Sequence, residues 1–451
     1  MQGGALRSGE FEVGGVYAPD GRRLAARHLP PVLQTRSITL TPKPSQARSF
    51  LVPTSKNSPR RAATRQGEDR YNDFRFSFES GEYRYDVEAP LLLHPDFDTL
   101  LIASRRHLTK KERRKVILKK VGAVTGREAR ARATEEVRLA GFLHHPKIAR
   151  VFDFVVNNGT PFVVMEHSKG SFLFTLLDLA ATVERLLPIP FAVHIAAEVA
   201  DALAYAHECE DDSGTPLHIV HRAVGPMRIR LTVDGRVKLC NFGAAYSELA
   251  GRMPTPRDLL RGDPAYIAPE LLRAIFAATQ RKSDPLTAKE LDGRADIFSL
   301  GLVLLEMLTA KYPLDPLGLL PDRPASRFPA GIRTEHSTWI SLEVLANRVL
   351  RFGTEEVLRA TGVVFEPLRA LLVRALALDP AQRYRTAADF RDDLRGYLRE
   401  IGAVNYGRQQ VMDEVAITVR MATERKLLAA QPMEYGVLPD LEDLRDEEKS
   451  G

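Results

Sequence analysis

The stretch that decides the fold of this chain runs from His221 to Gly243 and reads HRAVGPMRIRLTVDGRVKLCNFG. Three of its side chains bear on chemistry. Ala223 has no group that could accept a proton, and Arg228 is a cation that would repel a metal ion. Asn241 offers a metal only one neutral oxygen. The stretch therefore predicts two loops joined by a hairpin, with neither a proton acceptor nor a carboxylate at these three positions.

The stretch resembles the catalytic and metal-binding segment of a protein kinase, which is His-Arg-Asp followed by a hairpin and Asp-Phe-Gly. In this alignment Ala223 stands for the catalytic Asp and Gly225 for the loop Lys. Arg228 stands for the metal-binding Asn, and Asn241 for the Asp of Asp-Phe-Gly. The Thr that bonds the catalytic Asp and Lys is replaced by Asp263. Because the whole group has changed, the resemblance implies that no catalytic residue is intact and that no metal site remains.

The positions that hold a kinase fold together are kept. Ala268-Pro269-Glu270 resembles the end of the family's activation segment, and Arg383 is placed to pair with its Glu. Asp296 begins a segment similar to the buried central helix, whose Asp supports the His-Arg loop. The structural positions implied by the resemblance are His221, Arg222, Phe242, Gly243, Glu270, Asp296 and Arg383. Their survival beside replaced catalytic residues is what a pseudokinase should show.

Alternating, strand-like segments precede this region. They predict strands over Tyr83–Val87, Leu91–Leu93, Thr99–Ser104 and Lys115–Lys120. In the family, the first hairpin of the small lobe carries a glycine-rich loop that covers the nucleotide phosphates. The corresponding turn, 92–98, has no glycine and contains Pro95 and two Asp residues. Because the backbone must approach the phosphates closely there, a phosphate-binding loop is not expected.

Val116-Ile117-Leu118-Lys119 resembles the family's Val-Ala-Ile-Lys strand, which makes Lys119 the phosphate-orienting lysine. Glu136 follows 17 residues later in a helical stretch and is expected to pair with it. The pair could orient phosphates, but it also holds the helix against the sheet, and this structural role is the preferred interpretation. Ile117 replaces a small residue over the adenine and narrows the slot.

Pro161–His167 resembles the strand that leads into the hinge between two lobes. Met165 would lie at the back of the nucleotide pocket, and the backbone from Glu166 to Ser168 would contact adenine. Arg230 stands where the family has an apolar floor; since a buried charge is costly unless paired, it should turn outward or fill the cleft. The cofactor-binding remnants are Lys119, Glu136, Met165, Glu166 and Ser168, with Ile117 and Arg230 as obstructions. No cofactor is expected, although weak metal-independent binding of ATP or ADP stays open.

The positive charge is concentrated in the N-terminal arm. The whole chain carries +6, whereas residues 1–70 hold 12 Lys or Arg and 5 Asp or Glu, which leaves −1 for the remainder. Prolines interrupt every candidate element there, so a mostly disordered arm is expected. A second basic segment lies at 105–120. Both could be solvated, or both could bind an acidic partner. Aromatic residues do not alternate with the basic ones, so no specific nucleic-acid module is expected.

Cys209 and Cys240 are the only cysteines, and neither has a convincing metal-ligand neighbour. The N-terminus lacks the apolar core of a signal peptide. The longest apolar run, near Ile297–Leu308, is shorter than the roughly 20 residues of a membrane helix. These features predict a cytoplasmic protein without a membrane span. Ser247 and Thr255 are candidate phosphorylation sites, with Arg222 to pair the phosphate.

The resemblance implies an α+β, bilobal protein-kinase-like fold. The predicted parts are a basic arm at 1–82, a β-rich small lobe with one helix and the hinge at 83–167, a mostly helical large lobe at 168–400, and an extension at 401–451. The extension combines a helix over Arg408–Gln431 with an acidic tail. The segment 311–365 is a longer connection than a minimal kinase needs.

The relatives implied by the resemblance are bacterial Ser/Thr kinases of the eukaryotic type. Three functions follow. The chain could be a pseudokinase that regulates an active kinase or an assembly through protein binding. It could be a Ser/Thr kinase with weak or atypical ATP-dependent transfer. It could be a structural component of a larger assembly. The replaced loop residues favour the first.

Overall fold

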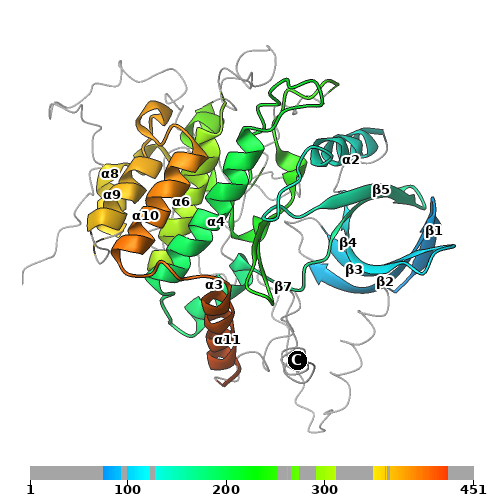
Figure 1. Ribbon diagram of the computed structural model, residues 1–451, viewed down its shortest axis with the longest axis horizontal. Helices are drawn as coiled ribbons and strands as arrows, with labels where there is room; N and C mark the ends of the chain where they lie inside the picture. The colour runs from blue at the N-terminus through cyan, green and yellow to red at the C-terminus, as the bar shows by residue number, and fades with distance from the viewer. Residues whose placement is uncertain are drawn as a thin grey trace, which may run out of the picture. The chain divides into compact units, whose positions relative to one another are not determined.

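The computed structural model describes residues 75–92, 99–121, 127–251, 262, 266–273, 291–310, 349–360, 362 and 366–424. All of them belong to one compact unit, Arg61–Gly451 (Figure 1). The other unit, Met1–Arg60, lies outside the described residues, and so do the acidic tail and Thr255. The predictions made for the N-terminal arm before residue 75 and for the acidic tail therefore stay predictions.

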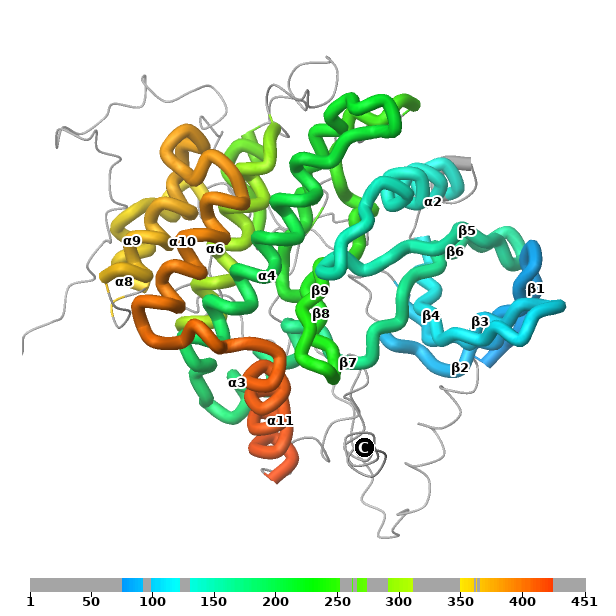
Figure 2. Tube along the Cα trace, in the orientation of Figure 1, coloured from blue at the N-terminus to red at the C-terminus, as the bar shows by residue number. Residues whose placement is uncertain are grey.

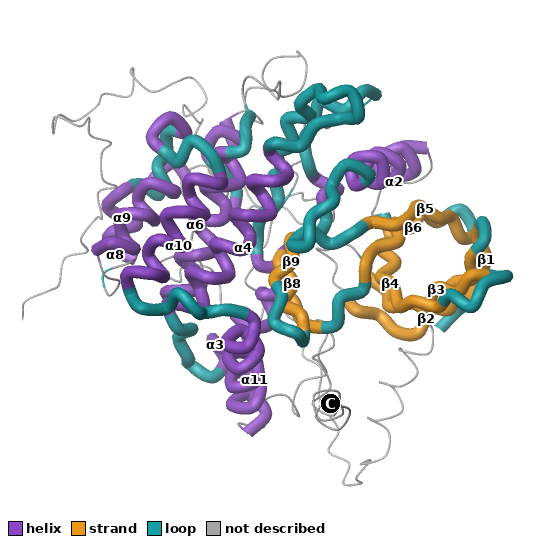
Figure 3. Tube along the Cα trace, in the orientation of Figure 1, coloured by secondary structure: helices purple, strands orange, loops and turns teal. Residues whose placement is uncertain are grey.

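The small lobe is a six-stranded antiparallel sheet in the order β1-β2-β3-β4-β6-β5. Its strands are β1 (Ser77–Ser80), β2 (Tyr83–Leu92), β3 (Leu100–His107), β4 (Arg113–Lys120), β5 (Val151–Asn157) and β6 (Thr160–Glu166). The sheet curls strongly, so that β1 and β5 at its two edges approach each other (Figure 3). Helix α2 (Arg127–Ala140) packs against β5 and β6. This is the predicted β-rich lobe with a single helix among its described residues.

The sheet begins earlier than the sequence predicted. Strand β1 lies within the segment 1–82 that was assigned to the arm, so this boundary was placed too late. The strand is held by Phe78, whose ring stacks on Tyr85 at 5.0 Å and on Phe162 at 6.2 Å. Two predicted strands are one, β2, which bends at two register shifts around Pro90. A bulge is where a sheet tolerates proline, and this is why the pattern looked interrupted.

The two faces of the sheet belong to different cores. On one face, aromatic and branched side chains of β1 to β6 pack against one another and form a core within the small lobe. The other face joins the large lobe in a single buried cluster, here called the cleft cluster. The fully or largely buried members of the cleft cluster are Leu91, Leu100, Ile117, Ala133, Val163, Met165, Phe172, Phe174, Met227 and Cys240. The second core thus spans the junction of the two lobes.

The large lobe is built on α4 (Ile189–His207), α6 (Arg294–Thr309) and α10 (Ala387–Glu400), which lie side by side (Figure 2). Around them lie α3 (Leu173–Thr182), α8 (Thr354–Ala360) and α9 (Glu366–Ala375). A three-stranded sheet of β7 (Gly170–Phe172), β8 (Ile229–Thr232) and β9 (Val237–Leu239) borders the hinge. The 3-10 turns are η3 (Pro226–Arg228), η4 (Phe242–Ala244) and η6 (Pro380–Gln382). Residues Ala295 to Leu308 of α6 are all buried, as predicted for a central helix.

Helix α4 is long and apolar enough to cross a membrane by length and composition, with a mean hydropathy of 1.3. However, 67% of it is buried inside the lobe, where it packs on α6 and α10. Burial of this kind is typical of a core helix.

The predicted C-terminal helix is present as α11 (Arg408–Glu424), and residues 425–431 of the prediction lie outside the described part. It packs on α3 through Val419 and Ala422. Arg185, just after α3, donates to Glu414 and lies 2.8 Å from Thr418. The extension therefore folds back on the large lobe, one of the two arrangements that the sequence left open.

Candidate functional site

The centre of the site is a buried triad of Lys119 on β4, Glu136 on α2 and Asn241 after β9. Lys119 Nζ lies 2.6 and 2.5 Å from the two carboxylate oxygens of Glu136 and 2.9 Å from Oδ1 of Asn241. The side chains of Lys119 and Glu136 are each 5% exposed. The predicted lysine–glutamate pair is therefore formed, with a third partner that the sequence analysis had assigned only to metal binding.

Gly243 is required by this triad. A Cβ atom at this position would lie 2.6 Å from Oε2 of Glu136 and 2.9 Å from Nζ of Lys119. Real Cβ atoms essentially never come that close, so the ends of Glu136 and Lys119 would have to shift to admit a side chain. The structural role predicted for Gly243 has this close approach as its physical reason.

Asn241 does not suit a magnesium ion. It adopts a left-handed conformation, φ 65°, which asparagine tolerates better than most residues. Its Oδ1 already accepts from Lys119 and, at 3.3 Å, from the backbone N–H of Gly243. Magnesium prefers carboxylate oxygens in octahedral geometry, and among the described residues no cluster of three His, Cys, Asp or Glu could hold a metal. The residues present do not fit the ion that a kinase uses.

Asp296 supports the loop at His221 as predicted. Its carboxylate accepts from the backbone N–H of His221 at 2.7 Å and of Arg222 at 2.8 Å, and lies 3.0 Å from Nε2 of His207. The ring of His221 meets Phe242 edge-on at 4.5 Å. Burial lowers the pKa of His221 to about 4, against the opposing effect of Asp296, so its imidazole is neutral near pH 7.

Two of the degenerate loop positions, Ala223 and Gly225, are surrounded by apolar packing. Ala223 is 3% exposed and carries no group that could take a proton. A Cβ atom at Gly225 would lie 3.2 Å from the ring of Tyr266, so this ring occupies the space beside the loop. The Tyr266 hydroxyl donates to the buried carboxylate of Glu306. Asp263, the third predicted member of this group, lies outside the described residues.

Arg222 is committed to the backbone. Its Nε donates to the carbonyl of Ala244 at 2.8 Å and its Nη2 to that of Ala245 at 3.2 Å. Ser247 is 1% exposed. In this structure the Ser247 hydroxyl is buried and the Arg222 guanidinium is engaged, and the hypothesis that Arg222 pairs with a phosphate on Ser247 or Thr255 stays a prediction.

Arg230 lies at the floor position and turns toward the hinge. Its Nε donates to the carbonyl of Ser168 at 2.7 Å and its Nη2 to that of Gly170 at 2.9 Å. It is 4% exposed, so it does not turn outward to solvent; its role as an obstruction of a nucleotide site stays a prediction. In the small-lobe sheet, Ile117 lies opposite Met165, and both belong to the cleft cluster.

The Glu166 side chain is held by a partner that the sequence analysis missed. Lys238 on β9 donates to its two oxygens at 2.6 and 2.8 Å, and Ser168 Oγ donates at 2.9 Å. Burial alone would raise the pKa of Glu166, but the hydrogen bond from Lys238 and a backbone N–H lower it. The sequence pattern around Lys238 indicates only a strand. No motif in the sequence connects Lys238 with Glu166 in the hinge.

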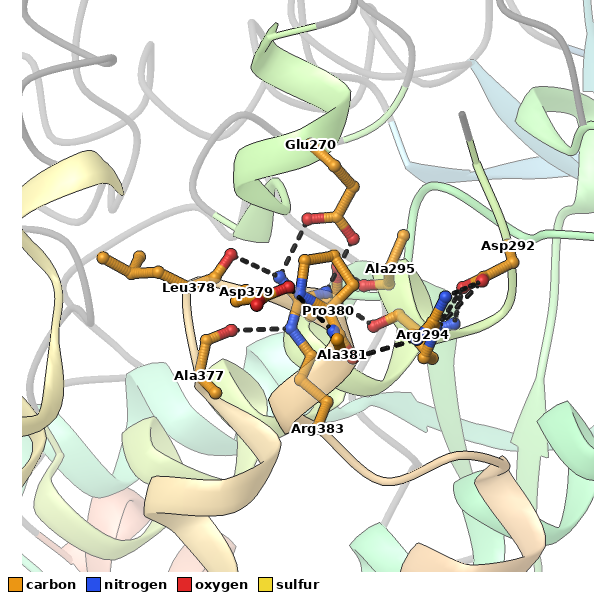
Figure 4. A network of polar contacts seen from close by, with 11 residues as sticks. Glu270, Asp292, Arg294, Ala295, Ala377, Leu378, Asp379, Pro380, Ala381 and Arg383 are labelled. Atoms are coloured by element: carbon orange, nitrogen blue, oxygen red, sulfur yellow. Dashed lines mark hydrogen bonds and ion pairs between the residues drawn. The ribbon is translucent and has the colours of Figure 1, made fainter. Parts of the chain in front are cut away.

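Glu270 and Arg383 form the predicted ion pair, with N–O distances of 2.6 and 2.8 Å (Figure 4). The guanidinium also donates to the carbonyls of Ala377 at 2.7 Å and Arg294 at 2.9 Å. Its Cζ atom lies 4.8 Å from the centre of the Phe298 ring. Arg383 thus ties the end of the activation segment to α6 and to the turn before α10.

The two-lobed fold and the triad of Lys119, Glu136 and Asn241 define the class as a kinase-like protein with an altered centre. Residues 104–388 match the model of the protein kinase domain, so this chain belongs to the protein kinase family. The chain is 32% identical over 266 residues to the tyrosine-protein kinase MasK of Myxococcus xanthus, an alignment that covers 59% of this chain and 35% of MasK. It is 29% identical over 267 residues to the serine/threonine-protein kinase PknB of Mycobacterium leprae, covering 58% and 35%.

Among solved structures, the kinase domain of Mycobacterium tuberculosis PknI, a double mutant, aligns with 69% of this chain and 94% of its own length. The sequence identity is 23% and the TM-score 0.43. The chain spans about a third of the length of the curated relatives it matches. The relatives bear out the predicted bacterial kinase family.

Proposed function

We propose that this chain is a pseudokinase, which has kept the kinase fold, has lost phosphotransfer, and acts by binding other proteins. The regulated partner would be an active kinase or a larger assembly in the cytoplasm. The curated relatives are kinases by name, so the proposal rests on residues in which this chain differs from the family pattern.

The observation that carries the proposal is the saturation of Lys119. A lysine ammonium has three N–H donors. Three oxygens lie within hydrogen-bond distance of it, two from Glu136 and one from Asn241. A nucleotide phosphate would have to displace one of them. The lysine therefore serves better as an internal strut between β4, α2 and the Asn-Phe-Gly turn than as a phosphate ligand.

The charge around the triad supports the same conclusion. The charged groups that act on the Cys240 thiol are Arg228, Arg230, Lys119 and Glu136, so three are cations and one is an acid. Among the described residues, these charges disfavour a further cation beside Cys240. No step of phosphotransfer can be assigned to Ala223, because a methyl group neither orients nor deprotonates a hydroxyl.

Two other functions deserve a test. The intact Lys119–Glu136 pair favours weak, atypical transfer, since this pair is also kept in working kinases. The α11 extension, which folds back on the large lobe, favours a purely structural role in an assembly. We propose no required cofactor, and we keep metal-independent ATP or ADP binding as a secondary proposal. An acidic protein partner for the basic segment at 105–120 is likewise proposed on charge alone.

The experiment is transfer of labelled phosphate from ATP, with magnesium or manganese, to the chain itself and to a general acceptor protein. The variants are Lys119→Met and, as a matched control on the same strand, the exposed Lys120→Met. A pseudokinase gives the same background signal in all three proteins. Incorporation that needs metal, is lost in Lys119→Met and persists in Lys120→Met would overturn the proposal.

A further inference from the structure

A hairpin of the large lobe holds the last residue of the small-lobe sheet. The hairpin consists of β8, β9 and the turn between them, residues 229–239, and is here called the hinge hairpin. Lys238 on β9 donates to both carboxylate oxygens of Glu166, the last residue of β6, at 2.6 and 2.8 Å. The lysine side chain is 9% exposed. Separation of the lobes at this point would leave a largely buried ammonium without its counter-charge, which is unfavourable.

The carboxylate of Glu166 is also bound within the small lobe. Its Oε2 accepts from the backbone N–H of Arg150 at 3.1 Å, and its Oε1 accepts from Ser168 Oγ at 2.9 Å. Arg150 directly precedes β5, and its carbonyl accepts from the backbone N–H of Glu166 at 2.8 Å. Glu166 therefore connects the hinge hairpin with the six-stranded sheet.

The hinge backbone is fixed on the side of the large lobe as well. The Arg230 contacts with the carbonyls of Ser168 and Gly170 are 2.7 and 2.9 Å long and buried. Gly170 has a φ of 138°, and a Cβ atom there would lie 2.0 Å from the carbonyl oxygen of Leu231. Hinge motion requires a few backbone positions that are free to change φ and ψ. The segment 168–170 has little of this freedom.

Backbone pairing adds a second link between the lobes beside the hinge. The N–H of Leu239 at the end of β9 donates to the carbonyl of Lys147 at 2.8 Å, and the N–H of Ala149 donates to the carbonyl of Leu239 at 2.9 Å. Residues 147–149 lead into β5. The cleft cluster closes the same junction with apolar side chains. Relative motion is the normal expectation for two bodies joined by a small polar contact, whereas a hydrophobic junction opposes it.

The hinge hairpin is itself supported by the C-terminal extension. Gly235 lies in its turn with a φ of 72°, and a Cβ atom there would lie 2.1 Å from the carbonyl oxygen of Arg408, the first residue of α11. The backbone of the turn thus packs directly on α11, which in turn packs on α3. The hairpin is therefore held at its turn by the extension and at its strands by the hinge.

We propose that the hinge hairpin clamps the two lobes in one relative orientation, through the ion pair of Lys238 with Glu166 and the contacts of Arg230. The hinge of this chain is then a fixed joint. The inference goes beyond the loss of phosphotransfer and does not depend on it, because it concerns the motion of the lobes and not the triad at Lys119. A partner protein would meet a preformed surface of both lobes, and only this consequence rests on the proposed function.

The test is the distance between spin labels on the two lobes, measured by pulsed electron paramagnetic resonance on the full chain. The labels are attached at exposed positions, through Glu79→Cys on β1 and Arg399→Cys on α10. The native Cys209 and Cys240 are buried, so the introduced thiols react first. A chain without the introduced cysteines gives the background. The clamp predicts a single narrow distance distribution in the labelled chain.

Lys238→Met should broaden this distribution or add a second distance. Because that variant leaves Glu166 without its cation, the decisive variant is the double change Glu166→Gln with Lys238→Met. It removes both charges together and leaves neither unpaired, so it should fold and still lack the clamp. Urea unfolding checks that it folds. The matched control is Arg236→Gln, an exposed arginine of the same hairpin that pairs with Asp234 at 2.8 Å, and it should keep the narrow distribution.

Two results would overturn the proposal. The first is a broad or double distribution in the labelled chain that carries no further change. The second is a narrow distribution that persists in the folded double variant, since the ion pair would then not be what holds the lobes. Phosphotransfer by the chain would contradict the proposed function and would leave both of these measurements unaffected.

Discussion

Nζ of Lys119 lies 2.9 Å from Oδ1 of Asn241. Asn241 stands at a position that binds metal in the family, and Lys119 at a position that binds phosphate. Here the Asn241 side chain accepts a hydrogen bond from Lys119 instead. This contact joins β4 to the loop after β9, and it converts two catalytic positions into one structural unit with Glu136.

Lys119→Met should destabilise the fold. The change leaves the Glu136 carboxylate, 5% exposed, without its cation, and breaking a buried ion pair costs about 3–5 kcal/mol. The free energy of unfolding from urea titration measures this. The exposed neighbour Lys120→Met should change it by less than about 0.5 kcal/mol. Equal stability of the two variants would contradict the structural role of the pair.

Arg383→Ala should lower the free energy of unfolding by a similar amount, about 3–5 kcal/mol. The change leaves the Glu270 carboxylate without its cation and buried carbonyls without a donor. The matched control is Arg399→Ala, at an exposed position in the last turn of α10. Chemical unfolding of both variants, followed by circular dichroism, gives the comparison. The account would be in error if Arg399→Ala were as costly as Arg383→Ala.

Stability should fall as the pH is lowered from about 6.5 to about 4. Burial holds the pKa of His221 at about 4 in the folded chain, below its ordinary value of 6.5. Between these pH values the unfolded chain binds a proton at His221 that the folded chain does not. The free energy of unfolding therefore has its full value above pH 6.5 and falls as the pH approaches 4. The shift corresponds to about 3 kcal/mol.

His221→Gln should reduce this pH dependence, since glutamine can still donate and accept in the same place but does not titrate; His167, whose pKa burial also lowers to about 4, keeps part of it. His144→Gln, at an exposed position, should leave the slope unchanged. Urea unfolding at several pH values between 4 and 7 provides the slopes. An unchanged slope in the His221 variant would assign the effect to other groups.

Glu414→Ala should loosen the docking of α11. Glu414 is 6% exposed and accepts from Arg185, and hydrogen bonds to charged groups are worth about 2 kcal/mol. Asp413→Ala, at the exposed neighbouring position, is the control. Hydrogen exchange along α11 would report faster opening in the first variant only. Identical exchange in both would show that the helix is held by its apolar face alone.

Much of the site could be predicted from the sequence because it lies in spaced motifs. The pairs Lys119–Glu136 and Glu270–Arg383 join residues whose positions in the family pattern imply contact, and both are formed. Asp296 likewise supports the loop at His221. These contacts hold the fold together, so they are kept in a chain whose catalytic residues are replaced.

The remaining features depend on tertiary context that no local pattern encodes. Strand β1 is short, and it is held by pairing with β2 and by the stacking of Phe78 on Tyr85 and Phe162. The link between Lys238 and Glu166 joins residues 72 positions apart without a motif. The direction of Arg230 was open between two alternatives, and the free hinge carbonyls decided it.

The central claim is that the scaffold survives without a magnesium-dependent nucleotide site. The most direct measurement is thermal unfolding of the full chain with ATP or ADP, each with and without magnesium. A ligand at 100 times its dissociation constant stabilises a protein by about 2.7 kcal/mol, which is readily detected. The account predicts no shift that requires magnesium. A shift that appears only when magnesium is present would contradict it and return Asn241 to the role of a metal ligand.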